Sequence, residues 1–179
     1  MANDVDIATM IRAVPDFPRT GVMFRDITTL LKDATGFRAV IERLAAAYSD
    51  VPLDKVAGIE SRGFIIGAAL ALMLRAGFVP IRKEGKLPAE NFGQDYALEY
   101  GTGRLEMHRD AIGVGERVLL VDDLIATGGT AEAAASLIEI VGGSLVGCAF
   151  IVDLPDLGGR ARLDSRGLPV VALCRFSGH

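Results

Sequence analysis

Both the fold and the functional site are indicated by one stretch, Val118-Leu119-Leu120-Val121-Asp122-Asp123-Leu124-Ile125-Ala126-Thr127-Gly128-Gly129-Thr130. Four consecutive apolar residues, Val118 to Val121, predict a strand that is buried on both faces, as in parallel sheets. Two carboxylates follow at the carboxyl end of this strand, where open α/β sheets bind their ligands. We therefore expect an α/β fold with a site at Asp122 and Asp123.

The residues after the two acids suit a phosphate group. Ala126 to Thr130 combine small residues, two glycines and two hydroxyls directly before an expected helix, so backbone N–H groups and the positive helix end face one point. Carboxylates do not bind phosphate directly, so we expect Asp122 and Asp123 to face ribose hydroxyls or a metal. A sugar phosphate satisfies both halves. A strand-ending turn with a simple helix cap needs neither the two acids nor the two glycines.

Short apolar runs alternate with helical patterns on both sides of this stretch. Apolar residues from Phe37 to Tyr48 recur with helical spacing. The further apolar or Ala-rich runs cover residues 56–59, 64–74, 78–81, 118–121, 130–141, 145–152 and 170–174. This order is typical of βαβ units, and it predicts a central, mainly parallel sheet flanked by helices. With 179 residues, we expect one domain over 1–179.

Three segments depart from the alternating pattern. Residues 1–34, with Pro15, Pro18 and Gly21, are expected to form a short helix and then an irregular cap. Residues 82–110 are interpreted as a flexible loop with a hairpin, because two strand-like runs flank Gly101 to Gly103. The helix expected at 64–74 is apolar on nearly every side, which favours a homodimer.

Composition and charge exclude several classes of protein. The chain has 19 Lys and Arg against 23 Asp and Glu, a formal net charge of −4, which argues against binding to nucleic acid or to an anionic membrane surface. The apolar run at 64–74 is far shorter than the ~20 residues of a transmembrane helix. No signal-like segment begins the sequence, so we expect a cytoplasmic protein. The two cysteines make no disulfide framework.

The stretch 118–130 resembles the phosphoribosyl-pyrophosphate (PRPP) signature of the type I phosphoribosyltransferase family. Other blocks resemble the adenine-specific members of this family, and together the blocks cover nearly the whole chain. They are Pro15-Asp16-Phe17-Pro18 with Gly21, Phe24-Arg25-Asp26-Ile27-Thr28, Glu60-Ser61-Arg62-Gly63-Phe64, Arg82-Lys83 with Gly85-Lys86-Leu87-Pro88, and Leu98-Glu99-Tyr100-Gly101. The resemblance implies the fold of this family, with an N-terminal cap (hood) and a flexible active-site loop.

The resemblance also implies roles for residues of this sequence. The 5′-phosphate is expected on Ala126, Thr127, Gly128, Gly129 and Thr130, and the ribose hydroxyls near Asp122 and Asp123. The diphosphate is expected at Ser61 and at four cationic side chains, Arg62, Arg82, Lys83 and Lys86. The alternative for any one of these four cations alone is solvated surface charge. We further expect a cis peptide between Glu60 and Ser61, which aims backbone N–H groups at the diphosphate.

Adenine is expected at Met23, Phe24 and Arg25, with Phe24 stacked on the purine and Leu124 and Ala126 on its other side. The alternative for Phe24 is plain core packing under the N-terminal cap. Glu99, Asp122 and Asp123 are expected to be catalytic. Glu99 is expected to handle the purine proton, whereas Asp122 and Asp123 hold the ribose. The alternative for Glu99 is an exposed acid of the hairpin. Mg²⁺ is expected on PRPP and diphosphate oxygens and water, with no protein metal site.

The resemblance implies purine salvage: AMP and diphosphate form from adenine and PRPP. Two alternatives stay open at this point. One is a phosphoribosyltransferase for another base, which would be xanthine, guanine or orotate. The other is a non-catalytic regulator that senses PRPP, although the chain has neither room for an added DNA-binding domain nor a basic face for nucleic acid.

Overall fold

The computed structural model describes residues 5–97 and 101–178. A seven-stranded sheet with strand order β5-β6-β4-β3-β7-β8-β9 forms its centre, and β1 and β2 pair in a separate small sheet. The strands are β1 (Arg12–Pro15), β2 (Met23–Asp26), β3 (Lys55–Ile59), β4 (Gly77–Lys83), β5 (Asn91–Ala97), β6 (Thr102–His108), β7 (Arg117–Ile125), β8 (Ser144–Asp153) and β9 (Val170–Arg175). The helices are η1 (Ala8–Met10), α1 (Thr28–Leu31), α2 (Ala34–Ala47), α3 (Arg62–Leu74), α4 (Gly129–Ile140), η2 (Pro155–Leu157) and α5 (Gly159–Asp164).

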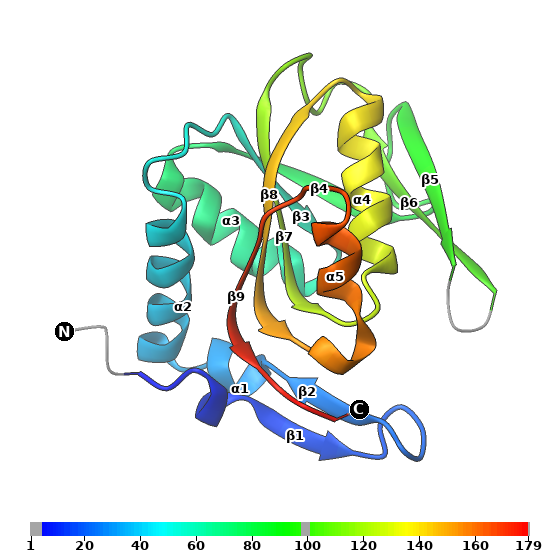
Figure 1. Cartoon of the computed structure of the whole chain (residues 1–179). Coiled ribbons are helices and arrows are strands. Elements are labelled where there is room, and N and C mark those ends of the chain that lie inside the picture. The colour runs from blue at the N-terminus through cyan, green and yellow to red at the C-terminus, as the bar shows by residue number, and fades with distance from the viewer. Residues whose placement is uncertain (1–4, 98–100, 179) are drawn as a thin grey trace.

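The expected α/β fold with a mainly parallel sheet is confirmed. β4, β3, β7, β8 and β9 run parallel, and β5 and β6 are added antiparallel at one edge. In Figure 1, α2 and α3 lie on one side of the sheet and α4 and α5 on the other. β3, β7 and β8, in the middle of the parallel strands, are largely buried, which explains their continuous apolar runs.

The core of the protein is centred on β7. Its residues Val118 to Val121 are all 0% exposed. Val118 and Leu120 pack in one apolar cluster with α4, while Leu119 and Val121 pack in a second cluster with α2 and α3. Successive side chains of a strand point to opposite faces, so this one run joins both halves of the core.

β7 is longer than its apolar run predicts, and it continues beyond its neighbour β3. β3 pairs with β7 only as far as Val121, whereas β8 stays paired with β7 to Ile125. Asp122 and Asp123 therefore lie inside the strand, not after its end, which corrects the boundary expected from the sequence. Because β3 has ended, no strand pairs with β7 at the two acids on that side, and both acids border a cavity there.

The N-terminal cap lies below the carboxyl ends of the central strands, next to the C-terminus (Figure 1). Its expected short helix is present as η1, but the segment after it is not irregular, because β1 and β2 form an antiparallel pair. Pro15 ends β1, a position where the missing N–H of proline is tolerated. In strands of four residues next to prolines, apolar and polar side chains alternate over too few positions for the sequence to predict a strand.

The expected hairpin is present and is part of the sheet. β5 and β6 pair from Asn91 with His108 to Ala97 with Thr102. β6 also pairs with β4, and Leu105 and Met107 are buried in the core. Much of the segment 82–110, which the sequence predicts to be a flexible loop with a hairpin, therefore consists of strands.

One side of α3 packs on the sheet through Ile66 and Leu70, which are 0% exposed. Its other side leaves Ile65, Leu72 and Met73 exposed at 47%, 82% and 48%. The sequence predicted a helix that is apolar all round, and the structure covers only one half of it. None of the helices in residues 5–97 and 101–178 has the length and apolar character needed to cross a membrane.

The cap gives a pH-dependent prediction. Hydrogen bonds from Thr28, and then from Arg12, lower the pKa of Asp26 to about 2; the Arg12 Nε donates to Asp26 Oδ2 at 3.0 Å. A depressed pKa in the folded state adds stability above the unfolded pKa of about 3.9, and this stability is lost as the pH falls. Asp26→Asn should therefore destabilise the protein at pH 7 and lose this effect between about pH 4 and pH 2, measured by urea unfolding.

The control for this prediction is Asp50→Asn, which changes an exposed acid on another part of the chain. A difference between wild type and Asp26→Asn that stays constant down to pH 2 would contradict the assigned role of Asp26.

Candidate functional site

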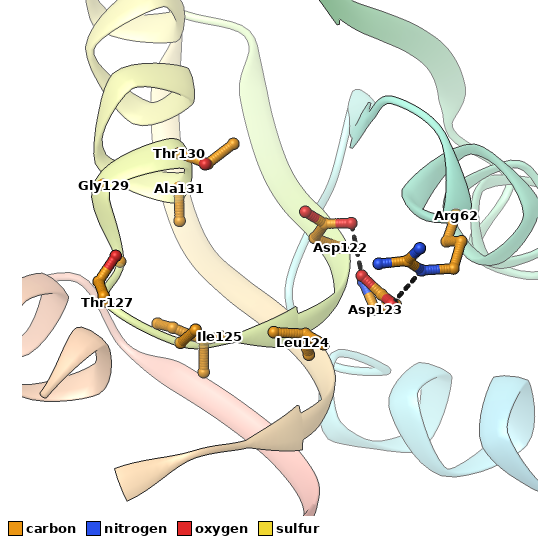
Figure 2. A pocket seen from close by; sticks show the side chains of 11 residues that line it. Arg62, Asp122, Asp123, Leu124, Ile125, Thr127, Gly129, Thr130 and Ala131 are labelled. Carbon is orange, nitrogen blue, oxygen red and sulfur yellow. Dashed lines mark hydrogen bonds and ion pairs between the residues drawn. The ribbon is translucent and has the colours of Figure 1, made fainter. Parts of the chain in front are cut away.

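A cavity lies at the carboxyl end of β7, and the start of α4 forms its far wall (Figure 2). Its lining comes from the first residue of α3, from β7, from the turn after β7 and from the first turn of α4. The lining residues are Arg62, Asp122, Asp123, Leu124, Ile125, Ala126, Thr127, Gly128, Gly129, Thr130 and Ala131. The structure thus brings together the two acids and the five residues that the sequence predicts for a phosphorylated sugar.

Residues 126–130, which comprise the turn after β7 and the first two residues of α4, are called the phosphate loop below, after their expected ligand. Gly128 has φ 80°, a left-handed conformation that glycine adopts without steric cost. Its carbonyl oxygen accepts the first helical hydrogen bond from Glu132 N at 2.9 Å. The N–H groups of the first turn of α4 have no helical partner, so the loop presents free donors at the positive end of α4.

The two acids have different environments. Asp123 is 3% exposed, and its Oδ2 accepts a hydrogen bond from the Nε of Arg62. Asp122 Oδ1 accepts a hydrogen bond from the backbone N–H of Asp123 at 2.9 Å. Burial, and then the nearby charge of Asp123, raise the pKa of Asp122 well above its usual range. A ligand that donates hydroxyl groups to Asp122 favours its charged form.

A second, strongly polar cavity adjoins the first on the side of β3. It is lined by Glu60, Ser61, Arg62, Lys83, Asp122 and Asp123. Asp122 and Asp123 each line both cavities. The expected cis peptide between Glu60 and Ser61 is confirmed. The region expected to hold diphosphate therefore adjoins the expected ribose site.

Two of the expected diphosphate cations, Arg82 and Lys86, are paired with Glu60, a partner that the sequence did not indicate. Glu60 accepts hydrogen bonds from Lys86 Nζ at 2.6 Å, Arg82 Nε at 3.1 Å and the backbone N–H of Lys83 at 3.1 Å. Although burial raises the pKa of Glu60, these hydrogen bonds lower it overall. Ser61 and Arg62 belong to the same turn and border the same cavity.

The cap reaches the site through Phe24. The guanidinium of Arg62 lies 5.7 Å from the centre of the Phe24 ring, and the same guanidinium is bonded to Asp123. Phe24 also packs edge-on against Phe17, with ring centres 5.1 Å apart. The expected stacking residue and the expected ribose acids therefore share one neighbour, Arg62.

The other expected base-binding residues divide into two groups. Leu124 lines the cavity beside Ala126. Met23 and Arg25 flank Phe24 in β2, and the guanidinium of Arg25 lies 4.3 Å from the Phe176 ring. Phe176 follows β9, so Arg25 joins the cap to the C-terminal segment. Glu99, the expected catalytic acid, lies outside the described residues.

Sequence reasoning missed the segment after β8. Residues 155–164 form η2 and α5, and Gly159 donates its backbone N–H to Ala126 O of the phosphate loop at 2.9 Å. Adjacent glycines, Gly158 and Gly159, were the available signal, because paired glycines often mark a close approach of two backbones.

Metal-binding side chains do not gather in the described part of the chain. Residues 5–97 and 101–178 contain no group of three or more His, Cys, Asp or Glu side chains that could hold a metal ion. Asp122 and Asp123 nevertheless supply oxygen atoms, the donors that Mg²⁺ prefers, at the wall of two polar cavities. These two carboxylates therefore fit a Mg²⁺ ion whose remaining ligands come from a bound substrate and water.

Comparison with known proteins gives consistent results. Residues 28–169 match the family described as Phosphoribosyl transferase domain. An adenine phosphoribosyltransferase of Nitrosospira multiformis is 62% identical over 175 residues, which cover 98% of this chain and 100% of that protein.

Solved structures agree with the sequence relatives. The crystal structure of adenine phosphoribosyltransferase from Thermoanaerobacter pseudethanolicus has a TM-score of 0.92 and 50% identity, covering 96% of this chain and 98% of that one. The Saccharomyces cerevisiae adenine phosphoribosyltransferase, complexed with an imino-altritol bisphosphate and adenine, has a TM-score of 0.88 and 39% identity, covering 94% and 97%.

The parallel sheet, the acids on the overhanging end of β7 and the phosphate loop define a type I phosphoribosyltransferase. Identity of this level over nearly the full length narrows the class further. The chain belongs to the adenine phosphoribosyltransferase family.

The acids of β7 provide a direct test of the site. Replacing Asp122 and Asp123 together by Asn keeps size and shape but removes the ion pair between Asp123 and Arg62, so thermal unfolding is used to check that the variant folds. The replacement removes the negative charge at the expected ribose site, and kcat/KM for phosphoribosyl transfer should fall by at least about 10²-fold, the usual cost of losing such an electrostatic contact. Steady-state kinetics with PRPP and adenine measure this fall.

Asp156→Asn is a suitable control, because Asp156 is an exposed acid of η2 outside both cavities. Unchanged kinetics in the double variant would show that the sugar binds elsewhere.

Proposed function

We propose that the protein is a purine salvage enzyme that transfers the 5-phosphoribosyl group of PRPP to N9 of adenine, giving AMP and diphosphate. The observation that carries this proposal is the shared cavity of Asp122, Asp123 and the phosphate loop. The base is inferred from the relatives, which are named adenine phosphoribosyltransferase. In the reaction the C1′–O bond to diphosphate breaks, the C1′–N9 bond forms, and N9 of adenine loses its proton.

We assign the sugar phosphate to the first cavity. The 5′-phosphate binds the backbone N–H groups of Ala126 to Thr130, aided by the hydroxyls of Thr127 and Thr130 and by the positive end of α4. The ribose hydroxyls donate to Asp122 and Asp123. Binding at both ends fixes C1′ near the second cavity, so the reacting atoms are held in place.

We assign the diphosphate to the second cavity. Ser61 and Arg62 lie in its wall, and Arg82, Lys83 and Lys86 surround Glu60 beside it. Arg suits bidentate contact with phosphate oxygens, whereas Lys acts as a point charge. These cations stabilise the negative charge that develops on the leaving diphosphate.

Adenine is proposed to stack on Phe24, with Leu124 and Ala126 on the other side and Met23 and Arg25 supplying backbone contacts. Phe24 suits this role because its ring lies beside Arg62, next to the ribose acids. Aromatic stacking contributes about 1–3 kcal/mol per base but does not select adenine. Glu99 is proposed to take part in moving the purine proton.

Mg²⁺ is the proposed cofactor, held mainly by PRPP and diphosphate oxygens and water, with Asp122 and Asp123 as the nearest protein donors. When bound, it would neutralise charge on the diphosphate. The residues of this chain then hold the ribose, supply cations to the leaving group and exclude water from the closed site. Chelation with EDTA should abolish turnover, and added Mg²⁺ should restore it.

A homodimer is proposed to form through the exposed side of α3. Three apolar side chains of this helix, Ile65, Leu72 and Met73, are exposed on one surface. Exposed apolar groups of this kind mark contact surfaces between proteins. A cytoplasmic location, no contact with nucleic acid or membranes, and the organisation as one domain with a cap at residues 1–34 stay predictions from the sequence.

The test of the reaction is a panel of free bases, with PRPP, Mg²⁺ and measurement of diphosphate release. Adenine should be converted to AMP, whereas xanthine, guanine and orotate should give no nucleotide. Turnover of xanthine without adenine would refute the substrate, and PRPP binding without turnover of any base would identify a PRPP-sensing regulator instead.

The dimer gives a separate prediction. Leu72→Glu places a charge on the most exposed apolar side chain of α3, and burying it in an interface is costly. The variant should sediment as a monomer in analytical ultracentrifugation, whereas wild type sediments as a dimer. Val114→Glu, which changes another highly exposed apolar residue outside α3, is the control and should stay dimeric. A monomeric wild type would refute the dimer.

A further inference from the structure

The back of the phosphate loop rests on the first residue of α5, which no sequence motif indicated. Gly159 N donates to Ala126 O at 2.9 Å. A Cβ atom on Gly159 would lie 2.4 Å from Ala126 O and 2.6 Å from Gly128 N, whereas real Cβ atoms essentially never approach closer than 3.0 Å. The backbones of α5 and of the loop are therefore in direct contact.

The contact is equally close from the side of the loop. A Cβ atom on Gly128 would lie 2.9 Å from both the Cα and the carbonyl oxygen of Gly159. Gly128 also needs glycine for its φ of 80°, but Gly159 is not among the residues with positive φ. The space beside the loop, and not the backbone angle, is what requires glycine at position 159.

A side chain of α5 holds the loop at a second point. Arg162 Nε lies 2.9 Å from Glu132 Oε2, in the first turn of α4. The Nη1 of the same guanidinium donates to Thr127 O at 3.5 Å. One short helix thus contacts Ala126, the centre of the loop and the start of α4.

α5 is itself anchored to the strands β8 and β9. Asp153, at the end of β8, is 1% exposed, and Arg160 Nη1 and Arg175 Nε lie 3.7 Å and 3.5 Å from its Oδ2. Arg160 also donates to Val170 O at 2.8 Å, and Leu163 is fully buried. A larger residue at 159 would therefore move the loop, which borders an open cavity, in preference to α5.

We propose that Gly159 is a positioning residue for phosphoribosyl transfer. Because Gly159 has no side chain, the backbone of α5 contacts the phosphate loop directly and fixes its position. This inference rests on the proposed assignment of the 5′-phosphate to the loop. Gly159 touches no substrate and acts only through the loop. Its effect should fall on the phosphate end of PRPP and leave adenine recognition unchanged.

The experiment measures steady-state kinetics of Gly159→Ala in the full chain, with PRPP and adenine each varied in turn. A displacement of about 1 Å costs up to about 10²-fold, so KM for PRPP should rise at least about tenfold. KM for adenine should change less than about twofold. Gly113→Ala is the matched control, because Gly113 lies outside the site and an added Cβ there would meet only the flexible Glu116 side chain, at 3.4 Å or more.

Thermal unfolding of each variant separates a fold defect from a positioning defect. If Gly159→Ala does not fold, Arg162→Gln tests the contact between α5 and the phosphate loop. Arg162 is half exposed, so its replacement should leave the fold intact, and this variant should raise KM for PRPP selectively by severalfold. An unchanged KM for PRPP in the folded variant, or equal rises for both substrates, would overturn the role of Gly159. Absence of turnover in wild type would instead contradict the proposed function.

Discussion

The ion pair between Arg62 and Asp123 is the interaction on which the site depends. Asp123 is almost completely buried, and burying a carboxylate is costly unless it has a charged or hydrogen-bonding partner. Arg62 supplies this partner from the first residue of α3, and its guanidinium also lies against Phe24 of the cap. One side chain therefore connects α3, β7 and the N-terminal cap, which are far apart in sequence.

Much of the fold could be predicted because its central strands are buried on both faces. The run Val118 to Val121 and the helical stripe from Phe37 to Tyr48 follow directly from burial. β1 and β2 escaped prediction because strands of four residues leave little periodicity. β5 escaped in part because its polar side chains lie on a half-covered edge of the sheet, where composition carries little signal. α5 was missed because six residues are too few for a helical pattern.

The site was predictable where its chemistry is local. Asp122, Asp123 and the phosphate loop are contiguous in sequence, and their residue types alone indicate a sugar phosphate. The contacts that join distant segments were not predictable: Glu60 with Arg82 and Lys86, and Gly159 with Ala126, depend on how β3, β4 and α5 pack. The expected base-binding residues were inferred from the resemblance to a family, because an aromatic residue near a cap can also be a core residue.

Glu60 has a consequence for anion selectivity. Its carboxylate already accepts three hydrogen bonds, from the side chains of Arg82 and Lys86 and from the backbone N–H of Lys83, so part of the positive charge beside the second cavity is balanced before any substrate arrives. An incoming anion has to compete with this internal carboxylate and not merely with water. A singly charged ion such as chloride or acetate gains nothing by such an exchange, whereas a polyanion with several oxygens offers more charge and more acceptors. An internal acid among these cations is therefore expected to favour multivalent anions over the monovalent salts of the surrounding solution.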